Sequence, residues 1–189
     1  MNMDLFRRLE AAVPRVSNWI DEYLRVHAQH ARSVYSLNNP RLAVSFPEDL
    51  LRRTKTVTLE AIDYPPVENF GLPEFVDPAP ERRLGVTFKD TYFIRRESDS
   101  EDLHFHELVH IVQWERLGPE RFLLAYAVGL ANHGDRESPL ETMAYSLQRE
   151  FYEGFYRRGL NAYIEEHADI AWLEVDRLRA ACGVVDGDR

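Results

Sequence analysis

The segment that contains HFHELVH, residues 104–110, constrains the fold of this chain more than any other. Serines at positions 98 and 100 stand before it and can cap a helix, and two acidic residues follow where the first turn would be. The pattern stops at Gly118-Pro119, a pair that commonly ends a helix. These signals predict a helix that begins near Ser100 and ends at Gly118, with the histidines on its N-terminal half.

Three histidines and a glutamate fall on this helix with different orientations. His106 and His110 are four residues apart, so an α-helix places them on one face, roughly 6 Å apart along the axis. Glu107 lies between them in projection. His104 comes two residues before His106 and therefore faces the opposite side of the helix. The pattern thus separates one histidine from a pair that shares a glutamate.

Two imidazoles at this spacing can bind one zinc ion, and a carboxylate between them is the base that such a site uses. Zinc lowers the pKa of a bound water, and Glu107 is placed to take the proton of that water. The sequence therefore predicts a Zn²⁺ site with His106 and His110 as ligands and Glu107 as the catalytic base. The alternative interpretation is an ordinary helix with two surface histidines and a solvated glutamate.

A catalytic zinc site needs a third ligand from the protein. The arrangement in which a third histidine follows six residues later is excluded, because that position is Arg116 and Gln113 stands where a glycine would be needed for the turn. The remaining candidates lie in later elements: His133, Asp135, Glu137 and Glu141. We predict Glu141, in the first turn of a helix that opens at Ser138-Pro139. The competing role for Glu141 is a capping box with Ser138.

The two motifs HELVH and PLETMAY, residues 106–110 and 139–145, together resemble the gluzincin family of zinc metallopeptidases. The short chain resembles the small single-domain members of that group, and the resemblance covers roughly residues 84–156. It implies a zincin-like fold, zinc held by His106, His110 and Glu141, and Glu107 as the base. Several gluzincin families carry an aspartate one turn after the ligand glutamate, where this chain has Tyr145. Another residue must then orient a zinc-binding histidine.

The substrate side of the predicted site includes a strand and three side chains. Zincins in general hold extended peptide along an edge strand that precedes the active helix. The candidates for that strand are Thr91, Tyr92 and Phe93. The alternative is that their aromatic rings pack under the helix. The candidates for stabilising a transition state or supporting the ligands are His133, Tyr126 and Tyr145, although each tyrosine is individually more often structural.

The remaining patterns predict an α+β fold that is mostly helical. Residues 3 to about 37 carry apolar side chains at helical spacing, with a kink or restart at Pro14. Residues 56–63 alternate as a strand does, and residues 84–96 predict a hairpin that turns at Lys89-Asp90. The prolines of residues 63–80 predict an extended loop. Further helices are expected over about residues 119–131, 138–156 and 162–181.

Together these elements predict a single zincin-like domain over residues 1–189, in which a small β-sheet carries the active-site helix. We expect a helical and proline-rich N-terminal region over residues 1–80 and a catalytic core over residues 84–156. A C-terminal helix is expected over residues 160–182.

Composition limits the partners and the compartment. The formal net charge of −9 has the wrong sign for a non-specific nucleic-acid binder. The longest apolar run, residues 122–131, is too short to span a bilayer, and the N-terminus lacks the apolar core of a signal peptide. Cys182 is the only cysteine, which excludes an internal disulfide. We therefore expect a cytoplasmic protein without nucleic-acid or membrane partners, although a dedicated export apparatus would leave no such signal.

The predicted function is a zinc-dependent metallopeptidase that hydrolyses peptide bonds in a peptide or protein substrate. The alternative is a non-catalytic, zinc-stabilised protein-interaction module. The missing aspartate at Tyr145 favours the module, whereas Glu107 favours the enzyme, because a purely structural zinc site has no use for a base. The sequence does not indicate an oligomeric state.

Overall fold

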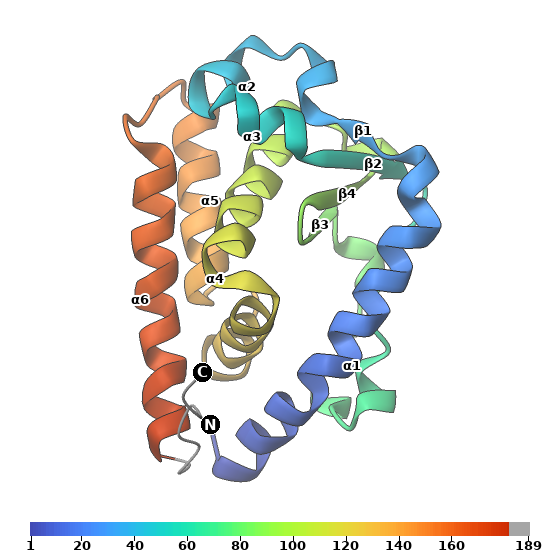
Figure 1. Ribbon diagram of the computed structural model, residues 1–189, viewed down its shortest axis with the longest axis vertical. Coiled ribbons are helices and arrows are strands. Elements are labelled where there is room, and N and C mark those ends of the chain that lie inside the picture. Colours follow the sequence, from blue (N-terminus) through green and yellow to red (C-terminus); the bar gives the residue numbers. More distant parts are fainter. Residues whose placement is uncertain (182–189) are drawn as a thin grey trace.

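The computed structural model describes residues 1–181 and has a mixed α+β fold with a four-stranded sheet (Figure 1). The strands are β1 (Arg32–Ser33), β2 (Lys55–Leu59), β3 (Gly85–Phe88) and β4 (Thr91–Arg95), in the order β1-β2-β4-β3. β2 and β4 run parallel, and the other two pairs are antiparallel. β3 and β4 form the predicted hairpin, which turns at Lys89-Asp90 with a positive φ of 56° at Lys89.

The sheet lies between two long helices, α1 (Met3–His27) and α4 (Glu101–His133) (Figure 1). Side chains alternate between the two faces along each strand. Tyr92 points toward α4, while its neighbour Phe93 points toward α1 and packs on Tyr23, with 4.9 Å between the ring centroids. Both strand residues are fully buried. The sheet therefore holds the histidine-bearing helix on one face and the N-terminal helix on the other.

α4 changes direction sharply at Gly118 (Figure 1). This glycine has φ 73° and ψ 167°, which breaks the helical geometry just before Pro119. The helix that the sequence predicts to end at this pair does so, and a second helical segment continues to His133. Two further helices, α5 (Pro139–Tyr152) and α6 (Leu160–Ala181), pack against α4 on the side away from the sheet.

The elements between α1 and β2 are not foreshadowed by the sequence patterns. α1 ends at His27, not near residue 37, and two helices of six residues follow, α2 (Pro40–Ser45) and α3 (Glu48–Arg53). Helices this short have too few turns for apolar periodicity to reveal them. The 3₁₀ turns of the described chain are Ala28–His30, Val34–Leu37, Val67–Phe70, Pro73–Phe75, Pro80–Arg82 and Arg96–Ser98.

Pro14 lies inside α1, which continues across it to His27, so the helix does not restart there. The missing amide of a proline costs a helix one hydrogen bond, but packing can offset that loss. Leu9 and Ile20, on either side of Pro14, are almost completely buried in the same core. Tertiary contacts therefore hold α1 together across the proline.

The proline-rich segment between β2 and β3, residues 60–84, is called the prolyl connection below. As predicted, it is a loop between the two strands, and it contains three short 3₁₀ turns. α1 holds it in place through two arginines: Arg8 donates a hydrogen bond to the carbonyl of Gly71 at 2.7 Å, and Arg15 donates to the carbonyl of Asn69 at 2.6 Å. The connection therefore forms one wall of the molecule beside α1.

The strand predicted to bind substrate is not at the edge of the sheet. β4 pairs with β2 on one side and with β3 on the other, and Thr91, Tyr92 and Phe93 are buried in this interior strand. That prediction is wrong, because the hairpin pattern shows that β3 and β4 are neighbours but not which of them pairs with β2. The outer strand on this side is β3.

Among the described residues, none of the helices combines the length and the apolar character that crossing a membrane requires.

Candidate metal centre

Side chains from two helices meet in a buried cluster, called the triad below. His106 and His110 come from α4, and Glu141 comes from the first turn of α5. The Nε2 atoms of the two histidines are 3.1 Å apart, and the Glu141 carboxylate oxygens lie 3.4 Å from Nε2 of His106 and 3.5 Å from Nε2 of His110. The atoms that could act as ligands all lie within 4.8 Å of one another. This triad could hold a metal ion, and it contains the three residues that the sequence predicts as ligands.

Glu141 does not form the competing capping box. Ser138 is the N-cap residue of α5, but within the described chain its side chain caps no amide and its buried Oγ has no hydrogen-bond partner. The start of α5 packs tightly on α4, since a Cβ atom added to Gly129 would lie 3.0 Å from Cβ of Ser138. This close approach of the two helices places the carboxylate of Glu141 at the histidines.

Gln113 orients His110. The side-chain oxygen of Gln113 lies 2.8 Å from Nδ1 of His110, and its amide nitrogen donates to the carbonyl of Leu140 at 3.1 Å. Because the amide nitrogen faces Leu140, the oxygen accepts the Nδ1 proton of His110. That bond directs the Nε2 atom of His110 toward the triad, which is the tautomer that a metal-binding histidine needs.

His106 has a different environment. Its ring packs on Tyr145, with 4.7 Å between the ring centroids and an angle of 52° between the planes. The Nδ1 atom of His106 is buried and has no hydrogen-bond partner among the described residues. Tyr145 therefore restrains the ring of His106 by packing.

The edge strand β3 holds the carboxylate of Glu107. The hydroxyl of Thr87 donates a hydrogen bond to Oε2 of Glu107 at 2.6 Å. Gly85, two residues earlier on the same face of β3, leaves room for the other oxygen: a Cβ atom there would lie 2.3 Å from Oε1 of Glu107. Trp114 ties the strand to α4 by donating to the carbonyl of Thr87 at 3.1 Å. Glu107 is thus fixed by groups outside its own helix.

The charged groups of the cluster alter one another's protonation. Burial acts to lower the pKa of His110, but the carboxylate of Glu141 outweighs it and raises this pKa to about 9. Burial acts to raise the pKa of Glu141, but His110 and His106 outweigh it and hold this pKa well below its ordinary value. Burial raises the pKa of Glu107 against the opposing effect of both histidines and Thr87. A metal ion would displace the proton that His110 and Glu141 hold between them.

The triad lies in a cleft of about 1290 Å³ that continues between α4, the prolyl connection and α1. The α1 wall is apolar and consists of Leu9, Ala12, Val13, Val16 and Ile20. Glu107, Gly85 and Thr87 line the same cleft. A ligand in the cleft would therefore contact both the triad and the edge strand β3.

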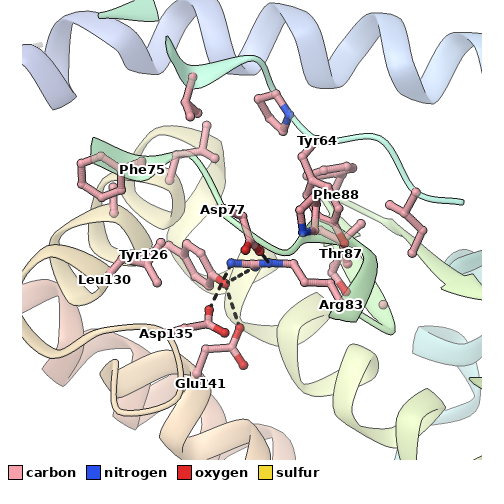
Figure 2. A pocket seen from close by; sticks show the side chains of 18 of the residues that line it. Tyr64, Phe75, Asp77, Arg83, Thr87, Phe88, Tyr126, Leu130, Asp135 and Glu141 are labelled. Carbon is pink, nitrogen blue, oxygen red and sulfur yellow. Dashed lines mark hydrogen bonds and ion pairs between the residues drawn. The ribbon is translucent and has the colours of Figure 1, made fainter. Parts of the chain in front are cut away.

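Arg83 crosses this cleft between the prolyl connection and the triad (Figure 2). Its Nε donates to Asp77 at 2.6 Å, and its terminal nitrogens lie 3.4 Å from Asp135 and 3.5 Å from the hydroxyl of Tyr126. Tyr126 in turn donates to Oε1 of Glu141 at 3.0 Å. A continuous polar network thus joins the prolyl connection to the third residue of the triad.

The other predicted site residues are divided between the cleft and the rest of the molecule. Tyr126 and Tyr145 line the cleft and contact members of the triad, as described above. His133 does not: its Nε2 lies 3.7 Å from Glu174 of α6, and 42% of its side chain is exposed. The prediction is therefore wrong for His133, because the last turn of α4 points it at α6.

His104 faces away from the triad, as its position in the sequence predicts. Its Nδ1 lies 2.6 Å from the hydroxyl of Tyr92 in the sheet, and its Nε2 lies 2.9 Å from Asp99. These bonds anchor the start of α4 on the sheet, so His104 has a structural role.

The three residues described above as contacting His110 or Glu107 are missing from the sequence-based prediction. Gln113 has a usable signal, because it follows His110 by three residues and must lie near it on a helix. Gly85 and Thr87 alternate on one face of a strand, but their contact with Glu107 depends on how the hairpin docks, which local patterns do not reveal.

Comparisons of this chain with models of protein families, with curated proteins and with solved structures find no match. The functional argument therefore rests on the geometry of the triad, of Glu107 and of the cleft around them.

Proposed function

We propose that this protein is a zinc-dependent peptidase with a zincin-like active site. The observation that carries the proposal is the position of Glu107. Its carboxylate lines the same cleft as a buried group of two histidines and one glutamate, and the hydroxyl of Thr87 holds it there at 2.6 Å. A site that only stabilised the fold would gain nothing from a second buried carboxylate that is not one of the three ligands.

The donor set fits zinc. Two imidazole nitrogens and one carboxylate oxygen form the three-ligand set of several catalytic zinc sites, which leave a fourth position for water or substrate. A mixed nitrogen and oxygen set does not suit magnesium or calcium, which prefer oxygen ligands. When bound, zinc would supply a Lewis acid that lowers the pKa of a water and polarises a carbonyl group.

Glu107 would move the proton. Its carboxylate accepts a proton from the attacking water, and it then gives that proton to the amine that leaves when the peptide bond breaks. Thr87 and Gly85 keep the carboxylate in place during this transfer, because one supplies a hydrogen bond and the other supplies space. Tyr126 and Tyr145, which line the same cleft, are the candidates for contacting the developing negative charge.

The substrate would bind along β3. In the described part of the chain this strand pairs with another strand on one side only. The carbonyl of Thr87 on its outer side already accepts from Trp114, so the main-chain groups of Gly85 are the ones that can pair with an extended peptide. Gly85 and Thr87, which flank Glu107, belong to the same strand. A peptide added there would pass next to the base, which supports a polypeptide as the substrate.

The test combines zinc content with hydrolysis of an unfolded protein such as casein. Wild type should retain about one zinc per chain after dialysis, Glu141→Ala should lose most of it, and Glu107→Gln should retain it. Casein hydrolysis should occur with wild type and fall by at least about a hundredfold with Glu107→Gln. Wild-type protein that takes up no zinc after reloading would refute the proposal.

The non-catalytic zinc module is the second candidate. The Nδ1 of His106 favours it, because this atom has no hydrogen-bond partner among the described residues and packing orients the ring. The same experiment separates the two candidates. Equal zinc content and equally absent hydrolysis in wild type and Glu107→Gln would support the module.

A further inference from the structure

One face of α5 carries a row of side chains that starts at the triad. Glu141, Tyr145, Gln148 and Tyr152 are spaced by four, three and four residues. At about 100° per residue, Tyr152 lies only about 20° around the helix from Glu141 and about 16 Å further along its axis. The row therefore runs nearly parallel to the helix axis, from the candidate metal centre to the end of α5.

The cleft follows this row over its first half. Tyr145 packs on His106, and Gln148 donates a hydrogen bond to Asp102 at 2.9 Å. Both Tyr145 and Gln148 line the cleft, together with Leu103 from the first turn of α4. The cleft thus extends from the triad toward the C-terminal end of α5, which is the end away from the apolar wall of α1.

Beyond Gln148 the row reaches an exposed segment, residues 152–159, called the aromatic turn below, which runs from the last residue of α5 to the start of α6. Every residue of this turn is exposed. Tyr152 is 75% exposed, Phe155 64% and Tyr156 49%. Three aromatic rings this exposed within five residues are unusual for a surface that only faces water, and aromatic residues are enriched in the centres of protein interfaces.

The aromatic turn is ordered by its own backbone. Gly154 has a positive φ of 85°, and its amide donates to the carbonyl of Phe151 at 3.0 Å. The amide of Phe155 donates to the carbonyl of Glu150 at 2.9 Å. Arg157 adds side-chain hydrogen bonds to Glu150. The rings are therefore presented from a defined turn, so a partner would bind without the entropy cost of ordering it.

We propose that the aromatic turn is a secondary binding surface for the polypeptide substrate, which would contact it at a distance from the bond that is cut. This inference rests on the proposed peptidase function. The occupant follows from continuity, because the row of α5 side chains joins the turn to the cleft. An extended chain rises about 3.4 Å per residue, so the span of about 16 Å corresponds to roughly five residues. Apolar side chains that far from the scissile bond would pack on the rings.

The test measures binding to a polypeptide that stays unfolded, fluorescently labelled reduced and carboxymethylated α-lactalbumin. The protein is zinc-loaded and carries Glu107→Gln, so that the probe is not cut during the measurement. Tyr152→Ser together with Phe155→Ser removes two rings of the aromatic turn. The matched control is Ile170→Ser together with Leu173→Ser on α6, where the side chains are 55% and 50% exposed. Fluorescence anisotropy gives the dissociation constant of each protein.

We expect the turn variant to bind the polypeptide at least about tenfold more weakly, as is common when exposed aromatic anchors are truncated, and the control to stay within about twofold of the parent. Equal binding by the turn variant and the parent, or no binding by the parent, would overturn the inference. The same proteins are tested for binding to vesicles of phosphatidylcholine and phosphatidylserine. If the turn variant loses vesicle binding but binds the polypeptide as the parent does, the turn belongs to a lipid-binding surface and the inference is overturned. Hydrolysis is assayed separately with wild type. If the turn variant binds weakly but wild type cuts nothing, the peptidase proposal fails and the polypeptide-binding surface remains.

Discussion

The side-chain oxygen of Gln113 accepts a hydrogen bond from Nδ1 of His110 at 2.8 Å, and its amide nitrogen donates to the carbonyl of Leu140 at 3.1 Å. One side chain thereby connects a predicted ligand on α4 to the start of α5, which carries Glu141. Gln113 therefore links the orientation of the His110 ring to the position of α5, the helix that supplies the third predicted ligand.

Replacing Gln113 should weaken metal binding. In Gln113→Leu the ring of His110 loses its acceptor, and the carbonyl of Leu140 loses a buried donor. We expect zinc affinity to fall by about tenfold to a hundredfold, the usual effect of removing a residue that orients a ligand. Competition with a chromophoric chelator measures it. Gln148→Ala is the control, since that amide is bonded to Asp102 and not to a ligand, and unchanged affinity in Gln113→Leu would contradict this role.

Substitution of Gly85 should separate metal binding from catalysis. A Cβ atom at this position would lie 2.3 Å from Oε1 of Glu107, so Gly85→Ala must displace the carboxylate. We expect zinc content to remain near one per chain while kcat/KM falls by about a hundredfold, because a displaced base loses its geometry. Val86→Ala, whose side chain points to the other face of the sheet, should retain activity. A Gly85→Ala protein as active as Val86→Ala would show that the position of Glu107 is not critical.

Acid should weaken the attachment of the prolyl connection. Burial acts to raise the pKa of Asp77, but the amide of Ala79 and the guanidinium of Arg83 outweigh it, so that this pKa lies below its ordinary value. A carboxyl with a lowered pKa contributes stability above its unfolded-state pKa of about 4, and this contribution is lost as the pH falls through the folded-state value. Asp77→Asn should therefore melt at a lower temperature than wild type at pH 7, and the difference should shrink toward pH 2. Thermal unfolding across this range in the presence of chelator measures it, and a constant difference would contradict the assignment.

The bend of α4 should not tolerate a side chain at Gly118. Its φ of 73° with ψ of 167° belongs to a region that is nearly exclusive to glycine. In the part of the chain that the structure describes, nothing lies within 4 Å of an added Cβ atom, so the cost of Gly118→Ala is backbone strain and not a clash. We expect a loss of about 1–3 kcal/mol in the free energy of unfolding, measured with urea. No loss of stability would mean that the bend can relax.

The parts of this protein that were predictable from the sequence depend on local spacing. His106, Glu107 and His110 follow from helical geometry, and Glu141 follows from its place in the first turn of the helix that opens at Ser138-Pro139. The outer strand was not predictable, because the choice between β3 and β4 depends on pairing with the distant β2. Gln113 illustrates a different limit. In the sequence, Gln113 served only to exclude a third histidine ligand six residues after His110. Its role in orienting His110 depends also on the carbonyl of Leu140, which comes near only because α5 packs on α4.

The strand order also governs how this cleft can form during folding. Thr56 of β2 lies opposite Tyr92 of β4, and their pairing closes a loop that contains the whole prolyl connection and β3. Closing so long a loop is entropically costly, and such non-local pairing is formed slowly. β3 can reach its outer position only together with β4, its partner in the hairpin. We therefore expect Thr87 to reach Glu107 in the same late step that completes the sheet, so that a partly folded chain has its histidines on a helix but no positioned base.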